Sequence, residues 1–388
     1  MLILMALLSE RDEIMIDIHL LLEKLLAQTG IPSLTLGNIF MVAVGFGLLY
    51  LGIKKKYEPF LLVGIGLSCI VANIPGSGLT EPGGLFNYAY QGVESLILPP
   101  LIFLGIGSMT DFGPMIANPS LVILGAAAHL GIFVSLIGAK VLGFSLAEAC
   151  SIGIIGGADG PMAIYTTMKL APHLLPQISV AAYSYMALMP LIQPPVMRFL
   201  TTKSERKIIM KQPRYVSRKE KLLFPVIITI IVNLLLPPVA PLITMLMLGN
   251  LIRESIVLEK MGQTLSNHFL NIITLILTIA IGSTMKAQSF LTSSTLIIIA
   301  LGLVAFIFGT ASGVICARIM CKLSGGKINP LIGSAGIASV PIAARVSHKV
   351  GQEENRSNFL IMHAMGPNLA GVFGTAISGG IMLALLAK

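Results

Sequence analysis

Long apolar runs separated by short polar segments fill most of the chain. They lie at 38–53, 60–74, 95–109, 120–143, 178–199, 222–238, 239–252, 268–286, 293–317 and 358–386. Several are shorter than the ~20 residues that a helix needs to span a bilayer, and many contain Gly or Pro. The pattern predicts an all-α polytopic membrane protein with about ten transmembrane or half-spanning helices.

Two segments rich in glycine and polar residues interrupt these runs, at 149–172 and at 327–348. Broken backbone at membrane depth is tolerated only where it is buried in protein or lines a cavity. We therefore expect both segments to be re-entrant or discontinuous elements.

A weak internal repeat relates the two halves. The sequence LIFLGIGSM at 101–109 is similar to LILTIAIGSTM at 275–285, with Gly107 matched to Gly282. The polar-glycine segments follow the two copies at comparable distances, and an even number of predicted spans separates the copies. This predicts an inverted-topology repeat with a binding site at the midplane, where the two broken segments meet. The alternative is chance similarity between apolar helices that share a Gly-Ser pair.

Composition agrees with a membrane protein. Hydrophobic residues make up 55% of the 388 residues and charged residues 11%, whereas soluble domains carry about 25% charged residues. The four cysteines form no CxxC pair, so neither a disulfide framework nor a zinc site is indicated. There is no soluble domain, phosphate loop, nucleophile elbow or histidine-carboxylate cluster, which argues against ATP-driven transport by this chain alone.

The net charge of +9 is a topology signal, because the basic residues cluster outside the apolar runs. The loop 201–221 holds eight basic residues and is predicted to be cytoplasmic by the positive-inside rule. The basic run 54–56 is predicted to lie on the same side, since an even number of crossings separates the two. No basic patch interleaved with aromatic residues appears, so no nucleic-acid partner is expected.

These signals divide the chain into four parts. We predict an N-terminal interfacial helix at 1–36, a first membrane half at 37–200, the basic cytoplasmic loop at 201–221 and a second membrane half at 222–388. An acidic-basic cluster follows the first eight apolar residues, and this argues against a secretory signal peptide.

Asp159 is the only acidic residue in the segment 149–172. An ionised carboxylate at bilayer depth is costly, so such residues usually face a protein interior or a water-filled cavity and act there. The surrounding GGADGP at 156–161 breaks helical backbone. We interpret Asp159 as a cation ligand; the alternative is a capping aspartate in a short extracellular turn.

The second segment, NPLIGSAGIASVPIAAR at 329–345, offers carboxamide and hydroxyl oxygens and kinked backbone. These neutral oxygens suit an alkali cation whose charge one carboxylate balances. Simple packing of small residues is the alternative, but it leaves Asn329 before Pro330 unexplained. Arg345 presents a planar fork of donors suited to a carboxylate or carbamate, although an interfacial arginine that snorkels is an open alternative.

Two further groups lie near these segments. Asn368 follows Gly-Pro at the start of the last apolar run, another polar group on broken backbone. Tyr183 and Tyr185 lie near the start of the run after the first segment. One of the two hydroxyls is expected to meet Asp159, unless both tyrosines are interface anchors.

Three motifs in order give a specific resemblance: GGADGPMAIY at 156–165, NPLIGSAGIASVPIAARV at 329–346 and GPNLAGVFG at 366–374. The chain resembles the β subunit of sodium-pumping, biotin-dependent decarboxylases, whose members act on oxaloacetate, methylmalonyl-CoA, glutaconyl-CoA or malonate. The resemblance covers nearly the whole hydrophobic chain.

The resemblance implies a membrane subunit of a complex. In that family a carboxyltransferase subunit moves the carboxyl group from substrate to biotin on a carrier subunit. The β subunit then decarboxylates carboxybiotin, consumes a proton and exports Na+ across the bacterial inner membrane. The implied partners are therefore a carboxyltransferase subunit, a biotin carrier subunit, a small membrane subunit and further copies of the chain itself. Carboxybiotin is not covalently bound to this chain.

The resemblance also implies residue roles. Catalytic roles fall on Arg345, Asp159 and Tyr185, and carboxybiotin binding on Arg345 and Asn329. The implied sodium ligands are Asp159, Asn329, Gly333, Ser339 and Asn368.

One departure concerns the serine among the implied sodium ligands. The family pattern Gly-Val-Ser-Ala-Val-Pro is replaced here by GIASVP at 336–341. Ala338 occupies the serine position, and Ser339 lies one place along, about 100° round a helix. The serine role therefore passes to Ser339, and a second cation site depends on that shift.

The runner-up function is a secondary transporter, a sodium-solute symporter or a cation-proton antiporter with the same architecture and no chemistry. A structural membrane anchor is a third option, but it leaves Asp159 unexplained. The symporter predicts sodium-dependent uptake by this chain alone, whereas the decarboxylase predicts sodium-dependent breakdown of carboxybiotin.

Overall fold

The computed structural model describes residues 23–387, and in this part of the chain it is helical, with no β-strand. The predicted interfacial helix at 1–36 falls mostly outside the described residues; of its described part, 23–28 are α-helical, 31–33 form a short 3-10 helix and α2 begins at Leu36. The all-α prediction is confirmed for the described chain.

The first half of the chain contains the elements η1 (Ile31–Ser33), α2 (Leu36–Ile53), α3 (Pro59–Ala72), α4 (Leu85–Glu94), α5 (Leu98–Met109), α6 (Gly113–Ala117), η2 (Pro119–Leu121), α7 (Val122–Ala128), α8 (Leu130–Val141), α9 (Leu146–Gly153), η3 (Ile154–Gly157), α10 (Gly160–Leu170), η4 (Pro172–Leu174) and α11 (Leu175–Leu200). The second half contains α12 (Lys203–Arg206), α13 (Arg218–Leu235), η5 (Pro237–Val239), α14 (Ala240–Glu254), η6 (Ile256–Leu258), α15 (Glu259–Thr264), the π-helix η7 (Leu265–Phe269), α16 (Leu270–Ser283), α17 (Ala287–Phe290), α18 (Ser293–Leu323), η8 (Pro330–Gly336), α19 (Ile342–Glu354) and α20 (Ile361–Leu386).

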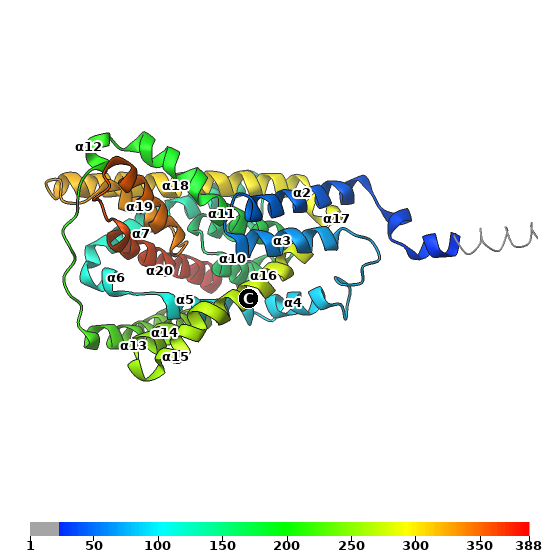
Figure 1. Cartoon of the computed structure of the whole chain (residues 1–388), viewed down its shortest axis with the longest axis horizontal. Coiled ribbons are helices and arrows are strands. Elements are labelled where there is room, and N and C mark those ends of the chain that lie inside the picture. Colours follow the sequence, from blue (N-terminus) through cyan, green and yellow to red (C-terminus); the bar gives the residue numbers. More distant parts are fainter. Residues whose placement is uncertain (1–22, 388) are drawn as a thin grey trace, which may run out of the picture.

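The helices form an elongated bundle along the long axis of the molecule (Figure 1). The elements α12, α6 and α13 lie at one end, and α17 and the start of α2 lie at the other. Six helical segments within 23–387 are long and apolar enough to cross a membrane, or up to seven if the pair α4–α5, bent by 78°, is one span. Both polar-glycine segments are broken, as predicted, while the count of about ten spans stays a prediction.

Several helix starts follow local sequence rules. The side chains of Thr35, Ser145 and Ser217 each accept a hydrogen bond from the amide three residues on. The backbone N–H of each of the three residues in turn donates to the side chain of that later residue, which makes a capping box at each helix start. These caps satisfy amide groups that a helix start leaves without an intrahelical partner.

Helices from the first half of the chain pack against helices from the second half. Helix α3 packs on α16 and α5 packs on α14, while α2 packs on α3 and α13 on α14. A Cβ added to Gly107 of α5 would lie 1.9 Å from the carbonyl oxygen of Leu246, and one added to Gly282 of α16 would lie 2.5 Å from that of Ile65. The residues matched in the sequence repeat thus play matching packing roles, which agrees with an inverted repeat; that symmetry itself stays a prediction.

Candidate functional site

The two broken segments meet at the centre of the bundle. Helix η3 ends at Gly157, Ala158 adopts a left-handed φ of 56°, and Asp159 starts α10 in an extended conformation. From the other half, the backbone N–H of Ala338, just after η8, donates a 2.9 Å hydrogen bond to the carbonyl oxygen of Gly157. We call this contact between the two segments the crossing.

Glycines allow the approach to the crossing. A Cβ added to Gly156 would lie 2.7 Å from the carbonyl carbon of Gly131 in α8. One added to Gly333 would lie 2.1 Å from the carbonyl oxygen of Gly313 in α18. Small residues therefore pack closely in both segments. This packing is enough to explain a glycine at 333, and the ligand role predicted for Gly333 stays a prediction.

Asp159 is buried at the crossing, with 5% of its surface exposed. Its Oδ1 accepts a 3.0 Å hydrogen bond from the amide of Met162, so it does cap a helix, but in the interior and not in an extracellular turn. In the part of the chain that the structure describes, no ion pair involves Asp159 and no group of three His, Cys, Asp or Glu side chains gathers anywhere. A buried carboxylate among neutral oxygens suits an alkali cation better than a transition metal.

Two free oxygens lie beside the crossing. The amide nitrogen of Asn368 on α20 donates to the carbonyl oxygens of Ala335 and Ile337, at 3.0 and 2.6 Å, while its Oδ1 is buried without a partner. The hydroxyl of Ser339 is also buried without a partner, and Ala338 uses its backbone to make the crossing. Buried polar groups are normally paired, so these oxygens are candidates for ligation.

The tyrosine ring that packs beside Asp159 is that of Tyr183, which lies against the adjacent Gly160. A Cβ added to Gly160 would lie 2.4 Å from Cζ of Tyr183, whose hydroxyl is buried without a partner. The hydroxyl of Tyr185 instead donates to the carbonyl oxygen of Ile299 on α18. The catalytic role predicted for Tyr185 is therefore not matched by a contact with Asp159 and stays a prediction.

Asn329 lies away from the crossing. It caps η8 through the amide of Leu331, and its nitrogen donates to the carbonyl oxygens of Arg206 and Ile208, at 3.0 and 2.8 Å. Seven residues of 3-10 helix follow it, which span about 14 Å at the usual rise. The structure does not bring Asn329 beside Asp159, so its roles as ligand and in carboxybiotin binding stay predictions.

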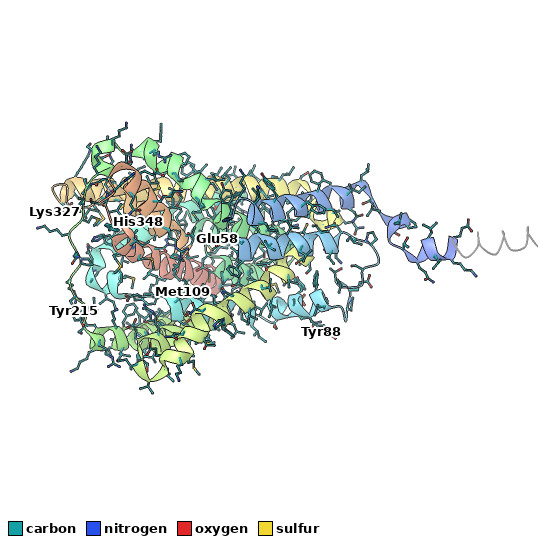
Figure 2. All side chains as sticks on the ribbon, viewed as in Figure 1. Glu58, Tyr88, Met109, Tyr215, Lys327 and His348 are labelled. Carbon is teal, nitrogen blue, oxygen red and sulfur yellow. The ribbon has the colours of Figure 1, made fainter. Side chains whose placement is uncertain are left out.

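Arg345 lies exposed on α19, and within residues 23–387 it makes no hydrogen bond or ion pair through its side chain. Burial raises the pKa of the Glu58 carboxyl at the α2–α3 turn, and the charge of Arg345 acts on it in the opposite direction. Figure 2 labels Glu58 near the middle of the bundle and His348 on α19. The guanidinium thus has an acidic neighbour and free donors for an incoming carboxylate.

Comparison with known proteins shows the family to which the chain belongs. The family model of the Na+-transporting oxaloacetate decarboxylase beta subunit matches residues 37–386. The chain belongs to this family. It is 55% identical over 365 residues to the glutaconyl-CoA decarboxylase subunit beta of Acidaminococcus fermentans, covering 94% of this chain and 97% of the relative. It is 53% identical to the methylmalonyl-CoA decarboxylase subunit beta of Veillonella parvula, covering 95% and 98%, and 46% identical to the oxaloacetate decarboxylase beta chain of Haemophilus ducreyi, covering 91% and 96%.

Membership of the β-subunit family confirms the resemblance drawn from the three motifs, and with it a multi-pass membrane subunit of a sodium-pumping decarboxylase. The family model and the relatives named above carry decarboxylase names, and they give no support to the symporter or antiporter alternative. The family also implies partner subunits and biotin-dependent catalysis.

Sequence reasoning missed His129, a buried imidazole between α7 and α8. Its Nδ1 lies 2.5 Å from the carbonyl oxygen of Gly125, and its Nε2 lies 2.8 Å from the hydroxyl of Thr375 on α20. Thr375 in turn lies 3.5 Å from the carbonyl oxygen of Gly157. An ionisable residue inside the apolar run 120–143 was the available signal, because such residues are rare in membrane spans.

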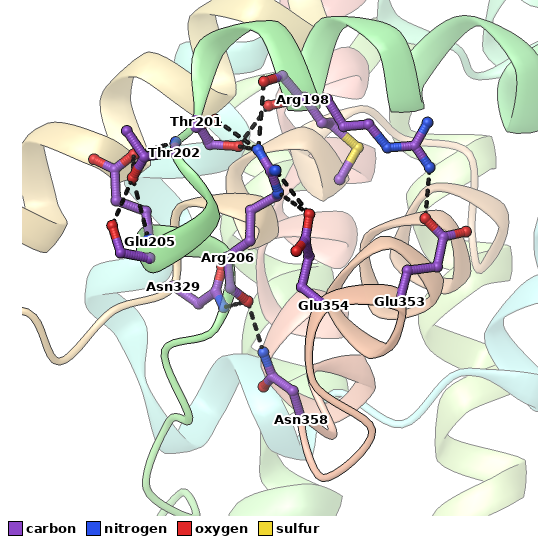
Figure 3. Close-up of polar contacts among 11 residues, drawn as sticks. Arg198, Thr201, Thr202, Glu205, Arg206, Asn329, Glu353, Glu354 and Asn358 are labelled. Atoms are coloured by element: carbon purple, nitrogen blue, oxygen red, sulfur yellow. Dashed lines mark hydrogen bonds and ion pairs between the residues drawn. The ribbon is translucent and has the colours of Figure 1, made fainter.

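A clasp at the end of α11, shown in Figure 3, joins the basic loop to the second broken segment. The guanidinium of Arg206 is almost fully buried, donates to the carbonyl oxygen of Thr201 at 2.6 Å and pairs with Glu354 of α19 at 2.7 Å. The amides of Asn329 and Asn358 both donate to the carbonyl oxygen of Arg206, at 3.0 Å. The clasp ties α11, which carries Tyr183, to η8 and α19.

Proposed function

We propose that this chain decarboxylates carboxybiotin delivered by a partner subunit, takes up a proton and exports Na+ from the cytoplasm. The observation that carries the proposal is the hydrogen bond from Ala338 to Gly157, because it gathers a buried carboxylate and unpaired oxygens from both halves at one point. Sites at which two discontinuous segments meet are typical of transporters that work by alternating access.

Arg345 performs the first step in this proposal. Its guanidinium forms two parallel hydrogen bonds with the carboxylate on the biotin nitrogen and draws it from water. The C–N bond then breaks, CO2 leaves, and the electron pair stays on the ureido nitrogen, which takes up a proton. Within the described residues, the Glu58 carboxyl makes no ion pair with this guanidinium, so the donors of Arg345 are free when the substrate arrives.

Sodium is the cargo of the second step. The Asp159 carboxylate binds Na+ together with the free oxygens of Ser339 and Asn368. A proton that reaches the carboxylate displaces the ion. Moving one charge against 100 mV costs about 2.3 kcal/mol, a modest demand on one decarboxylation.

The positive charge of the loop 201–221 and the family of the chain support an orientation in the membrane and a set of partner subunits. The loop 201–221 faces the cytoplasm of a bacterium, where the carboxyltransferase and biotin carrier subunits meet the chain. A small membrane subunit and further copies of the chain complete the complex within the inner membrane.

The test uses the purified complex with biotinylated carrier. Sodium-dependent CO2 release from carboxybiotin is measured for the wild type, for Asp159→Asn and for Glu148→Gln. Glu148 pairs with His173 at the surface, so its amide variant is the matched control. We expect Asp159→Asn to lose sodium stimulation and Glu148→Gln to keep it. Full sodium stimulation in Asp159→Asn would falsify the ligand assignment.

A further inference from the structure

Buried oxygens without partners gather on the hairpin of α10 and α11. Among the residues that the structure describes, five such side chains lie between Asp159 and Tyr185 in sequence: Thr166, Thr167, Gln177, Ser179 and Tyr183. Each is at most 6% exposed. Buried polar atoms usually find partners, so a concentration of unpaired oxygens on one hairpin calls for a ligand.

Helical spacing places three of these oxygens, those of Tyr183, Ser179 and Thr167, on the side of the hairpin where Gly160, the residue after Asp159, meets the Tyr183 ring. Tyr183 and Ser179 are four residues apart on α11 and lie on the same side of that helix. Gly160, which contacts the Tyr183 ring, and Thr167 are seven residues apart on α10 and also share a side. Helices α10 and α11 are joined by the short η4 turn and pack together. Ser179 and Thr167 therefore follow Tyr183 along the line of contact between the two helices, which we call the seam.

The spacing of the seam is regular. At 1.5 Å per residue, Ser179 lies about 6 Å and Thr167 about 10 Å further from the crossing than Tyr183 and Gly160. The seam runs toward the start of α11 at Leu175, the end opposite Leu200 and the basic loop. Near that end the side chain of Gln177 donates a 3.1 Å hydrogen bond to the carbonyl oxygen of Ser289, which ties the hairpin to α17.

We propose that the hydroxyls of Tyr183, Ser179 and Thr167 form a route by which an alkali cation leaves Asp159 for the side of the membrane opposite the basic loop. The inference rests on the proposed function, which supplies the ion and the direction. Hydroxyl oxygens are neutral ligands, so they replace part of the water shell without trapping the ion. Conduction needs several weak sites of this kind in series.

Thr166 provides the matched control on the same helix. Its hydroxyl is equally buried and unpaired, but it faces α20, where a Cβ added to Gly379 would lie 3.0 Å from its Oγ1. Thr166→Val therefore removes a buried, unpaired hydroxyl of the same kind at a position outside the seam.

The test measures export of radioactive Na+ by the complete complex in liposomes during decarboxylation. Thr167→Val and Ser179→Ala remove one oxygen each, and we expect each to slow export about fivefold, the order of effect for one lost polar contact. Thr166→Val should export at the wild-type rate. Thr167→Ser should also export at the wild-type rate, because serine keeps the hydroxyl that valine removes. Wild-type export in both Thr167→Val and Ser179→Ala, or equal slowing in Thr166→Val, would overturn the route.

A second measurement does not depend on turnover. Ag+ resembles Na+ in size and binds thiolates, so Ag+ applied on the far side should inactivate Ser179→Cys, and excess Na+ should protect it. The wild type, with its four native cysteines, is the control. An assembled Ser179→Cys complex that Ag+ leaves fully active contradicts the route. If instead the wild-type complex releases CO2 without any need for sodium, the proposed function itself fails.

Discussion

The backbone N–H of Ala338 lies 2.9 Å from the carbonyl oxygen of Gly157, and this hydrogen bond joins the two halves of the chain. Each partner sits next to a candidate ligand, Ser339 on one side and Asp159 two residues along on the other. The candidate ion site therefore exists only when both broken segments are in register. A motion of one half against the other that separates these two backbone groups would take the candidate ligands apart.

The close approach at the crossing predicts opposite effects for two glycine substitutions. A Cβ at Gly156 would lie 2.7 Å from backbone of Gly131, so Gly156→Ala should destabilise the protein by about 1–3 kcal/mol through overpacking. A Cβ at Gly47 in α2 meets nothing within 4 Å, so Gly47→Ala should leave stability unchanged or raise it by about 0.5–1 kcal/mol. Thermal unfolding of the purified complex checks both, and equal midpoints for the two variants would contradict the packing argument.

The sequence was sufficient for the fold class, the two broken segments and the burial of Asp159, because hydropathy and helix breakers act locally. The choice between Tyr183 and Tyr185 was not accessible, since residues two apart on a helix point about 200° apart and sequence does not give the rotation of α11. The partners of Asn329 depend on the path of the basic loop around Arg206, a tertiary contact without a local signal.

Arg345 offers a test of two-pronged carboxylate binding. Arg345→Lys keeps the charge and loses the planar fork, so kcat/KM for carboxybiotin should fall about tenfold to a hundredfold, the range for one charged hydrogen bond. The exposed Arg356 gives the control Arg356→Lys, which should keep wild-type kinetics. Steady-state rates over a series of carboxylated carrier concentrations decide the matter. Full activity in Arg345→Lys would remove the case for a bidentate contact.

The two tyrosines of α11 make separable predictions. Tyr185→Phe removes the donor to the carbonyl oxygen of Ile299 and should cost about 1 kcal/mol of stability. Tyr183→Phe breaks no protein hydrogen bond, so it should keep stability and weaken the apparent affinity for Na+. Thermal unfolding and sodium titration of CO2 release measure the two effects. Loss of turnover in Tyr185→Phe at wild-type stability would instead favour the catalytic role that the family resemblance implies.

The start of α13 should respond to acid in a defined range. Hydrogen bonds from Arg214, and then from the amide and hydroxyl of Ser217, lower the pKa of Glu220 from 4.5 to about 2. The carboxylate therefore stabilises this helix start fully above pH 4.5, and the contribution is lost as the pH falls toward 2, because the unfolded state binds its proton first.

Hydrogen exchange at the amide of Lys221, which bonds to the carbonyl oxygen of Ser217 at 3.1 Å, reports on this cap. After correction for intrinsic exchange rates, protection should fall across that acidic range in the wild type. Glu220→Gln keeps the shape of the side chain and cannot titrate, so its protection should be lower at neutral pH and flat on acidification. A wild-type amide whose protection is equally flat would show that the Arg214–Glu220 contact contributes nothing to the fold of the basic loop.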